Sequence, residues 1–164
     1  MRALTIRQPW ALGVDCGLTG AWALLDDDGR LVDVDDMPAG DTPGSISATF
    51  LGHAIGSRCP SRATPRVAVV EIAGAMPGQG VSSTWKFARA TGVVEGVLAG
   101  LGWPIHTVSP ARWKRALGLG KDKGASRAMA ARLWPDMADR FARVRDDGRA
   151  EAALIAHWWR EQQR

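Results

Sequence analysis

The sequence predicts an α/β fold, a central mixed sheet of five strands flanked by helices. Two apolar runs open the chain at 11–25, a third stands alone at 67–70, and helical patterns alternate with strand patterns from there on. Elements in that order form layers of helices on a central sheet. The 164 residues show no internal repeat, so we expect one domain, 1–164, with an N-terminal extension at 1–10.

The first three strands are predicted to form an antiparallel meander. Residues 11–25 contain two apolar stretches separated by a polar, glycine-containing segment at 15–20. The sequence DDDG at 26–29 is a hairpin turn signal. Residues 30–36 then alternate polar and apolar side chains, which is the period of a half-buried strand.

The rest of the chain is predicted to alternate helices with two more strands. The run at 67–70 is apolar at every residue, as in a strand that is buried on both faces, and the last strand is expected at 104–108. We expect helices at 47–57, 84–101, 110–117, 125–134 and 149–162, a mobile Gly- and Ser-rich loop at 74–83 and a basic loop at 118–124.

Composition and charge exclude several classes of protein. No apolar run reaches the ~18 residues that cross a bilayer, and the N-terminus lacks a secretory pattern, so we expect a cytoplasmic protein without a membrane partner. Cys16 and Cys59 are too isolated to form a zinc site. The net charge is +4, and lysine and arginine are dense from Lys86 onward, which suits a partner rich in phosphate.

Two carboxylates stand at the ends of predicted strands, where ligands bind in open α/β sheets. Asp15 interrupts an apolar strand two residues before a glycine, a pattern that turn chemistry alone also explains. Glu71 directly follows the most apolar strand, where no turn geometry asks for a glutamate. A carboxylate in such a place is costly unless a cation or hydrogen bonds compensate.

A third acidic cluster lies at the start of the last predicted helix. Asp147 and Glu151 are four residues apart and share a helix face, where like charges repel unless a cation is shared. Taken alone, the cluster is better explained by a capping aspartate and a solvated glutamate with arginine partners. Together with Asp15 and Glu71, it gives the ligand set of a two-metal phosphodiesterase site, in which hard cations bind oxygen.

Cationic side chains in the second half of the chain are candidates for contact with DNA phosphates, and some of them are expected to be ordinary solvated charges. The candidates are Lys86, Arg89, Lys114, Arg115, Lys121, Lys123, Arg127, Arg145 and Arg149. Trp85 is the nearest aromatic side chain to the 74–83 loop and the candidate for stacking on a base. Trp113 and Trp134 are expected to pack in the core or in a dimer contact.

Four segments, in order along the chain, resemble motifs of the RuvC-type Holliday junction resolvases. The first-strand acidic motif of that family is similar to VDCGLTGA at 14–21, and its second acidic motif and flexible loop to VVEIAGAMPGQG at 69–80. The Pro-Lys helix and Gly/Lys-rich loop of the phage and bacterial branch resemble VSPARWKRALGLGKDKGASRAMAARLWP at 108–135. The final acidic motif resembles DDGRAEAALIAH at 146–157.

This resemblance implies an RNase H-like fold, a homodimer, two Mg²⁺ or Mn²⁺ ions per active site and paired nicks in four-way (Holliday) DNA junctions. It implies no nucleotide cofactor, and a phage-encoded protein would act in the host cytoplasm. By position, it gives as catalytic metal ligands Asp15, Glu71, Asp147 and Glu151. The family's final motif usually has two aspartates three residues apart, whereas this sequence has a glutamate in the last place. Either Asp147 or, as the alternate, Asp146 could then be the third ligand.

Three alternatives remain open on the sequence alone. Another RNase H-like nuclease, acting on flap or branched DNA or on RNA–DNA hybrids, would use the same carboxylates. A catalytically inactive relative would bind DNA only. The actin-like ATPases and sugar kinases share the pattern of Asp15, Gly17 and Thr19, but they need two such domains and a much longer chain.

Overall fold

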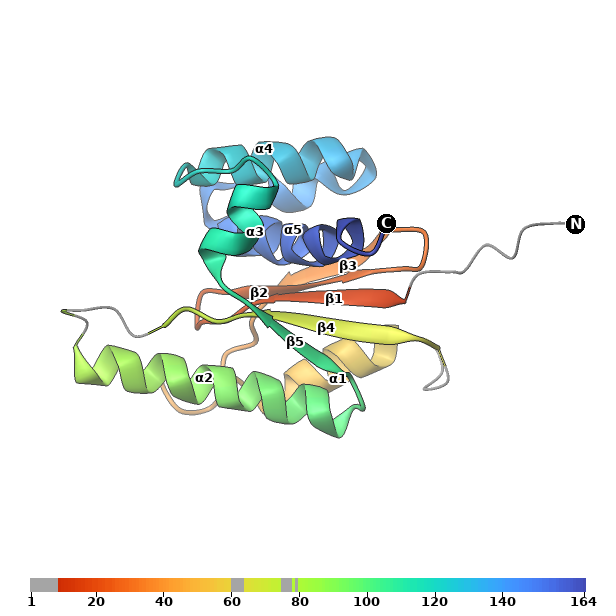
Figure 1. Ribbon diagram of the computed structural model, residues 1–164. Helices are drawn as coiled ribbons and strands as arrows, with labels where there is room; N and C mark the ends of the chain where they lie inside the picture. Colours follow the sequence, from red (N-terminus) through yellow and green to blue (C-terminus); the bar gives the residue numbers. More distant parts are fainter. Residues whose placement is uncertain (1–8, 60–63, 75–77, 79) are drawn as a thin grey trace, which may run out of the picture.

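In the computed structural model, one five-stranded sheet separates two layers of helices (Figure 1). The structure describes residues 9–59, 64–74, 78 and 80–164. The predicted N-terminal extension lies outside the described residues up to position 8, and Trp10 is already the first residue of β1 (Trp10–Asp15).

The strand order β3-β2-β1-β4-β5 confirms the mixed sheet. Strands β1, β2 (Ala21–Leu25) and β3 (Leu31–Asp36) form the expected antiparallel meander. Strands β4 (Arg66–Glu71) and β5 (Ile105–Val108) then run parallel to β1. The β1–β4 register pairs Asp15 with Glu71, so two carboxylates end neighbouring strands at the same edge of the sheet.

Helices α1 (Ala48–Arg58) and α2 (Val81–Gly100) cover one face of the sheet, and the later helices cover the other (Figure 1). The second layer contains α3 (Pro110–Ala116), α4 (Lys123–Leu133) and α5 (Asp147–Glu161). Two short 3-10 segments that the sequence did not indicate, η1 (Pro135–Phe141) and η2 (Val144–Asp146), join α4 to α5.

The start of α2 corrects the predicted loop at 74–83. Residues 81–83 form the first turn of α2, while 75–77 and 79 lie outside the described residues. Val81 is 87% exposed, and Gly80 at the N-cap offers no side-chain hydrogen bond. The first turn therefore carries neither an apolar face nor a capping residue that would mark it in the sequence.

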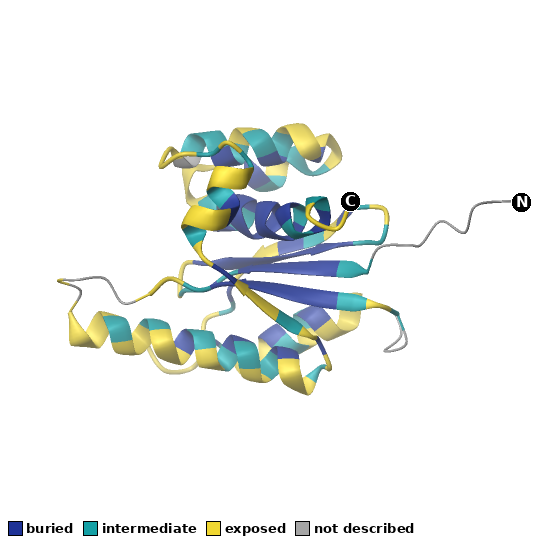
Figure 2. Ribbon diagram, in the orientation of Figure 1, coloured by how far each residue is buried: buried dark blue, intermediate teal, exposed yellow. Residues whose placement is uncertain are grey.

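Helix α5 is the centre of the second layer. Every residue from 150 to 156 is buried (Figure 2), because the sheet lies under the helix and α3, α4 and η1 also pack against it. Gly13 in β1 permits the closest approach, since a Cβ there would lie 1.9 Å from the carbonyl oxygen of Ala152. None of the described helices is both long enough and apolar enough to cross a membrane.

Candidate metal centre and the surrounding basic surface

Three carboxylates meet where β1 and β4 end. Asp15 is the last residue of β1, Glu71 is the last residue of β4, and Glu151 comes from the second turn of α5. One oxygen of each carboxylate lies within 4.8 Å of the others, so the structure brings together three of the predicted ligands. Such a group of oxygens at the end of two strands is suited to a divalent cation.

The carboxylate cluster is poorly hydrated. Glu71 is 9% exposed and Glu151 is 8% exposed. Burial raises the pKa of the Glu71 carboxyl and the nearby Glu151 carboxylate adds to this, while the Trp113 indole and the Lys114 ammonium oppose it. A cation among these oxygens would favour the charged forms, because an opposite charge offsets both burial and mutual repulsion.

Helix α3 supplies two neighbouring side chains that bind this cluster. The indole Nε1–H of Trp113 donates to Glu71 Oε2 at 2.5 Å, and Lys114 Nζ lies 2.7 Å from Glu151 Oε1. Lys114 was expected on the DNA-facing surface, and Trp113 was expected to serve only for packing. No spacing in the sequence marks the indole hydrogen bond, because it joins residues 42 positions apart on different elements.

The two aspartates at the start of α5 have different surroundings. Asp147 is the first residue of α5, and its Oδ1 accepts from Arg127 Nε at 2.8 Å. It lies outside the group of three oxygens that are within 4.8 Å of one another. Asp146 has a side chain only 1% exposed and accepts hydrogen bonds from the backbone and guanidinium of Arg143, both at 2.8 Å.

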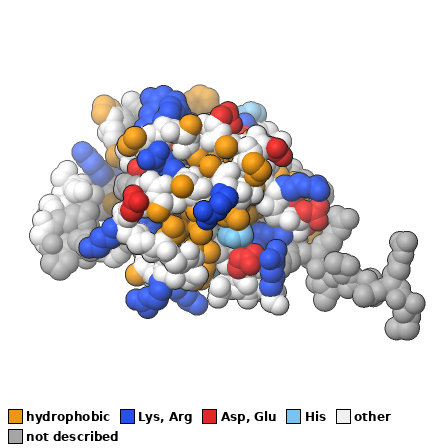
Figure 3. Space-filling model, turned by 90° about the horizontal axis from the view of Figure 1, so that it is seen from above, with side chains coloured by type: hydrophobic (Ala, Val, Ile, Leu, Met, Phe, Trp, Pro, Cys, Tyr) orange, Lys and Arg blue, Asp and Glu red, His pale blue; other side chains and the backbone are white. Residues whose placement is uncertain are grey.

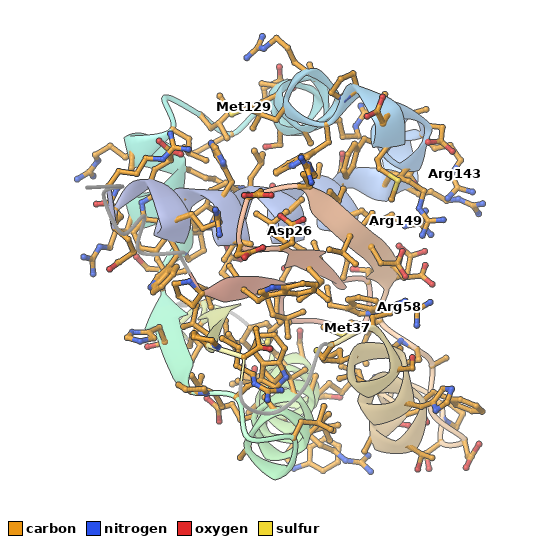
Figure 4. The ribbon with its side chains drawn as sticks, turned by 90° about the vertical axis from the view of Figure 1, so that its right-hand side faces the viewer. Asp26, Met37, Arg58, Met129, Arg143 and Arg149 are labelled. Atoms are coloured by element: carbon orange, nitrogen blue, oxygen red, sulfur yellow. The ribbon has the colours of Figure 1, made fainter. Side chains whose placement is uncertain are left out.

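The carboxylate of Asp146 is held by arginines from two sides. Burial raises its pKa, but the contacts with Arg143 and the charge of Arg149 outweigh burial, and the net pKa is below the ordinary value. Figure 4 shows Arg143 and Arg149 at the same edge of the molecule. Arg149 also binds Asp36 at the end of β3 at 2.7 Å, so this predicted DNA contact is already part of an ion-pair network.

Gly148 lets the first turn of α5 approach the cluster. A Cβ at this position would lie 3.0 Å from the carbonyl oxygen of Thr19 and 3.3 Å from Asp15 Oδ2. The positive end of the α5 dipole therefore lies beside the Asp15 carboxylate, which favours negative charge there. A glycine inside a helix is unfavourable by itself, so Gly148 is a signal from which a close approach could have been predicted, and the sequence reasoning missed it.

Of the nine predicted DNA-contacting residues, eight fall into two groups by exposure. Five are exposed: Lys86, Arg89, Arg115, Lys121 and Arg145. Three are half-buried and paired with acidic residues, namely Lys114 with Glu151, Arg127 with Asp147, and Arg149 with Asp35 and Asp36. Lys123 is the first residue of α4.

A cavity of about 730 Å³ adjoins the carboxylate cluster through Lys114. Arg115 and Lys121 also line it, together with Ala73 and Gly74 from the segment after β4 and other residues of α3 and the loop that follows it. Figure 3, which looks down on the α3 and α4 side, shows separate lysine and arginine side chains distributed among hydrophobic and uncharged ones. The cavity thus offers a hollow with three cations next to the candidate metal centre.

Trp85 stands out among the eight tryptophans, all of which lie in the described part of the chain. It is 60% exposed, whereas the other seven are buried or half-buried. Arg89, one helical turn further along α2, lies over its ring at 5.5 Å from the centroid. The first turns of α2 thus present an aromatic side chain and a cation together.

The sheet order and the two helical layers are those of the RNase H-like fold, in the arrangement found in RuvC. RuvC of Thermus thermophilus, solved with a Holliday junction substrate, matches with a TM-score of 0.63 and 17% identity over 94% of this chain and 96% of that chain. The yeast mitochondrial Holliday junction resolvase Ydc2 matches with a TM-score of 0.56 and 16% identity, over 94% of this chain and 79% of that one. The fowlpox virus Holliday junction resolvase gives a TM-score of 0.53 at 11% identity, over 94% and 99%.

In sequence, the chain is similar to the chloroplastic Holliday junction resolvase MOC1 of Chlamydomonas reinhardtii, with 36% identity over 91 residues. The matched segment is 54% of this chain and 10% of MOC1, so the chain spans a small part of that relative's length. No family model matches the chain. The resemblance to RuvC-like resolvases that the four motifs indicated is confirmed by this similarity and by the shared fold.

Proposed function

We propose that this protein is a metal-dependent endonuclease that resolves four-way (Holliday) DNA junctions by paired hydrolysis of phosphodiester bonds. The observation that carries the proposal is the cluster of Asp15, Glu71 and Glu151 beside a cavity lined with cations. MOC1 and the three structural neighbours are all named as Holliday junction resolvases, which supports the four-way junction as the substrate.

The cluster fits magnesium or manganese better than zinc. Its donors are carboxylate oxygens, which hard divalent cations prefer. The thiol of Cys16 is not among the ligand atoms that lie within 4.8 Å of one another, so the described cluster contains no soft ligand. In the proposed site, two bound ions would lower the pKa of the attacking water and stabilise the leaving oxygen.

We assign the fourth ligand to Asp147 rather than to Asp146. Asp147 and Glu151 are four residues apart on α5 and therefore lie on the same face of the helix. The Asp147 side chain is 18% exposed, whereas that of Asp146 is 1% exposed, so Asp147 is the more accessible of the two carboxylates. Both oxygens of Asp146 accept hydrogen bonds from Arg143, so this carboxylate stabilises the start of α5.

The chain's own cations would bind and orient the DNA backbone. Lys114 pairs with Glu151 and also lines the cavity, so this residue links the carboxylate cluster to the hollow that a phosphate would enter. Arg115 and Lys121 line the same cavity and would hold neighbouring phosphates. These contacts position the backbone without reading its sequence.

Paired nicks require two active sites, and we propose that a homodimer supplies them. The other acidic group found among the described residues, at 26–28, lies in the β2–β3 turn, where Asp26 Oδ1 accepts two backbone N–H groups. Gly92 and Gly96 are exposed on α2, four residues apart, so this part of the helix would let a second copy approach closely. Sedimentation equilibrium of the purified protein would test the dimer.

The test of function is cleavage of a labelled four-way junction with Mg²⁺ or Mn²⁺, beside linear duplex, a flap and an RNA–DNA hybrid. We expect symmetric nicks in the junction alone and none without metal or in Glu71→Gln. The matched control is Glu161→Gln on the same helix as Glu151, which should cleave normally because Glu161 pairs with Arg164 at the far end of α5.

Equal cleavage of the flap or hybrid would retain the active site but refute junction selectivity. Tight junction binding with no cleavage under any metal would identify a DNA-binding relative and refute the catalytic assignment. Loss of activity in Glu161→Gln together with Glu71→Gln would show that the readout follows general damage to the fold rather than metal binding.

A further inference from the structure

Two consecutive residues of α3 bind two of the three clustered carboxylates, and they do so with different chemistry. Lys114 brings a charge to Glu151 and is partly exposed. Trp113 is 0% exposed and brings an uncharged N–H to Glu71. A single helix therefore contacts both the end of β4 and the second turn of α5, the two elements that carry Glu71 and Glu151.

The hydrogen bond from Trp113 is not simply what a buried indole needs. The indole of Trp134, also buried, donates to the backbone carbonyl oxygen of Gly29 at 3.1 Å. The indole Nε1 of Trp103 is buried and has no hydrogen-bond partner in the described part of the chain. Of these three indoles, that of Trp134 thus donates to backbone, that of Trp103 has no partner among the described residues, and that of Trp113 donates to a carboxylate of the candidate metal centre.

An indole is well suited to hold a metal-binding carboxylate. It fixes the orientation of Glu71 through Oε2 because the ring itself is locked in the core between the sheet and α5. Since the indole carries no charge, the carboxylate keeps the charge that attracts a cation. A lysine or arginine in the same place would neutralise it, and the buried side chain of Glu71 has few waters that could orient it instead.

We propose that Trp113 is a positioning residue that holds Glu71 in the orientation required for metal binding. The inference rests on the proposed function, because it assumes that Asp15, Glu71 and Glu151 bind the catalytic ions. Groups that orient a metal ligand in this way typically change metal affinity by about 10–100-fold when they are removed. Trp113 would therefore affect metal affinity strongly although it touches neither metal nor DNA.

The experiment compares Trp113→Phe with Trp134→Phe. Both substitutions remove one indole N–H and part of a buried ring, but only the first changes the carboxylate cluster. Mn²⁺ binding to the DNA-free protein is measured by calorimetry and by electron paramagnetic resonance, and junction cleavage is then measured against metal concentration. We expect Trp113→Phe to raise the Mn²⁺ dissociation constant by about 10–100-fold. The variant should cleave poorly at low metal concentration and regain cleavage at high metal concentration. Trp134→Phe should bind Mn²⁺ within about twofold of wild type.

The outcomes separate this inference from the proposed function. Weak Mn²⁺ binding in wild type, unchanged by Glu71→Gln, would refute the metal centre itself. Normal binding in wild type, lost in Glu71→Gln but kept in Trp113→Phe, would refute the role of Trp113 alone. Equal losses in both tryptophan variants would show a general packing effect and also refute it. If Trp113→Phe does not fold, 3-benzothienylalanine at position 113, which keeps the ring shape and lacks the N–H, replaces it in the same comparison.

Discussion

The substitution Gly13→Ala tests how closely α5 must pack on β1 for the site to form. A Cβ at this position would lie 1.9 Å from the carbonyl oxygen of Ala152 and 2.7 Å from the amide nitrogen of Ala156. An ordinary contact begins at 3.4 Å, so backbone must move by about 1.5 Å, the difference between 3.4 and 1.9 Å. Both atoms belong to helix backbone, so no side chain can rotate away to relieve the contact.

We expect Gly13→Ala to destabilise the protein by about 3 kcal/mol, near the upper end of the ordinary range for overpacking. Activity should fall further than stability, because Ala152 adjoins Glu151 and the displaced helix carries that ligand with it. A displacement of about 1 Å at a reacting group can cost about 100-fold in rate. Urea unfolding followed by circular dichroism and junction cleavage well below the transition would measure the two effects separately.

The matched control for Gly13→Ala is Gly56→Ala in α1, on the opposite face of the sheet. A Cβ there would lie 3.6 Å from the Leu101 side chain, which is an ordinary contact. This variant should be as stable as wild type or more stable, because alanine favours a helix over glycine by about 1 kcal/mol. A Gly13→Ala protein that unfolds within about 0.5 kcal/mol of wild type and cleaves normally would refute the packing of α5 on β1.

Three further predictions follow from the site and its surroundings. Asp146→Asn should lower stability at neutral pH by about 2 kcal/mol, because the variant loses charged hydrogen bonds with Arg143. Since the pKa of Asp146 is lowered in the folded state, the stability that wild type gains over the variant should be lost as the pH falls below the ordinary pKa of 3.8. Unfolding curves of both proteins at pH 7 and pH 3 would measure this difference. Trp85→Ala should weaken junction binding in the absence of metal by about 1–3 kcal/mol and leave the melting temperature unchanged. Fluorescence anisotropy would measure the affinity, and an affinity equal to that of wild type would contradict the prediction. Mg²⁺ at 100 times its dissociation constant should add about 2.7 kcal/mol to the free energy of unfolding, and this gain should disappear with EDTA and in Glu71→Gln.

Much of the fold could be predicted because its strands carry simple patterns. The run at 67–70 is apolar throughout because β4 lies between β1 and β5 and is covered on both faces. The 3-10 segments η1 and η2 escaped prediction because they are too short to show a period. Phe141 and Trp134 lie near that stretch of chain, but their burial depends on contact with α5, which comes later in the sequence.

The candidate site could be predicted in part because the ends of strands can be recognised in the sequence. Asp15 and Glu71 end strands, and strands of a parallel pair bring their ends together. Glu151 follows from the last acidic motif. The partners of these carboxylates could not be predicted, because Trp113 reaches Glu71, and Arg127 reaches Asp147, only through the way α3 and α4 fold back over α5.

The late position of α5 in the chain has a consequence during synthesis. A nascent chain that stops before α5 already contains Asp15 and Glu71, but Glu151 and the central helix of the second layer are still missing. Such a nascent chain exposes apolar strand surface and is a natural client for chaperones. In the proposed nuclease, the carboxylate site is therefore complete only when α5 has docked on the sheet, so the docking of this helix and the assembly of the site are one event.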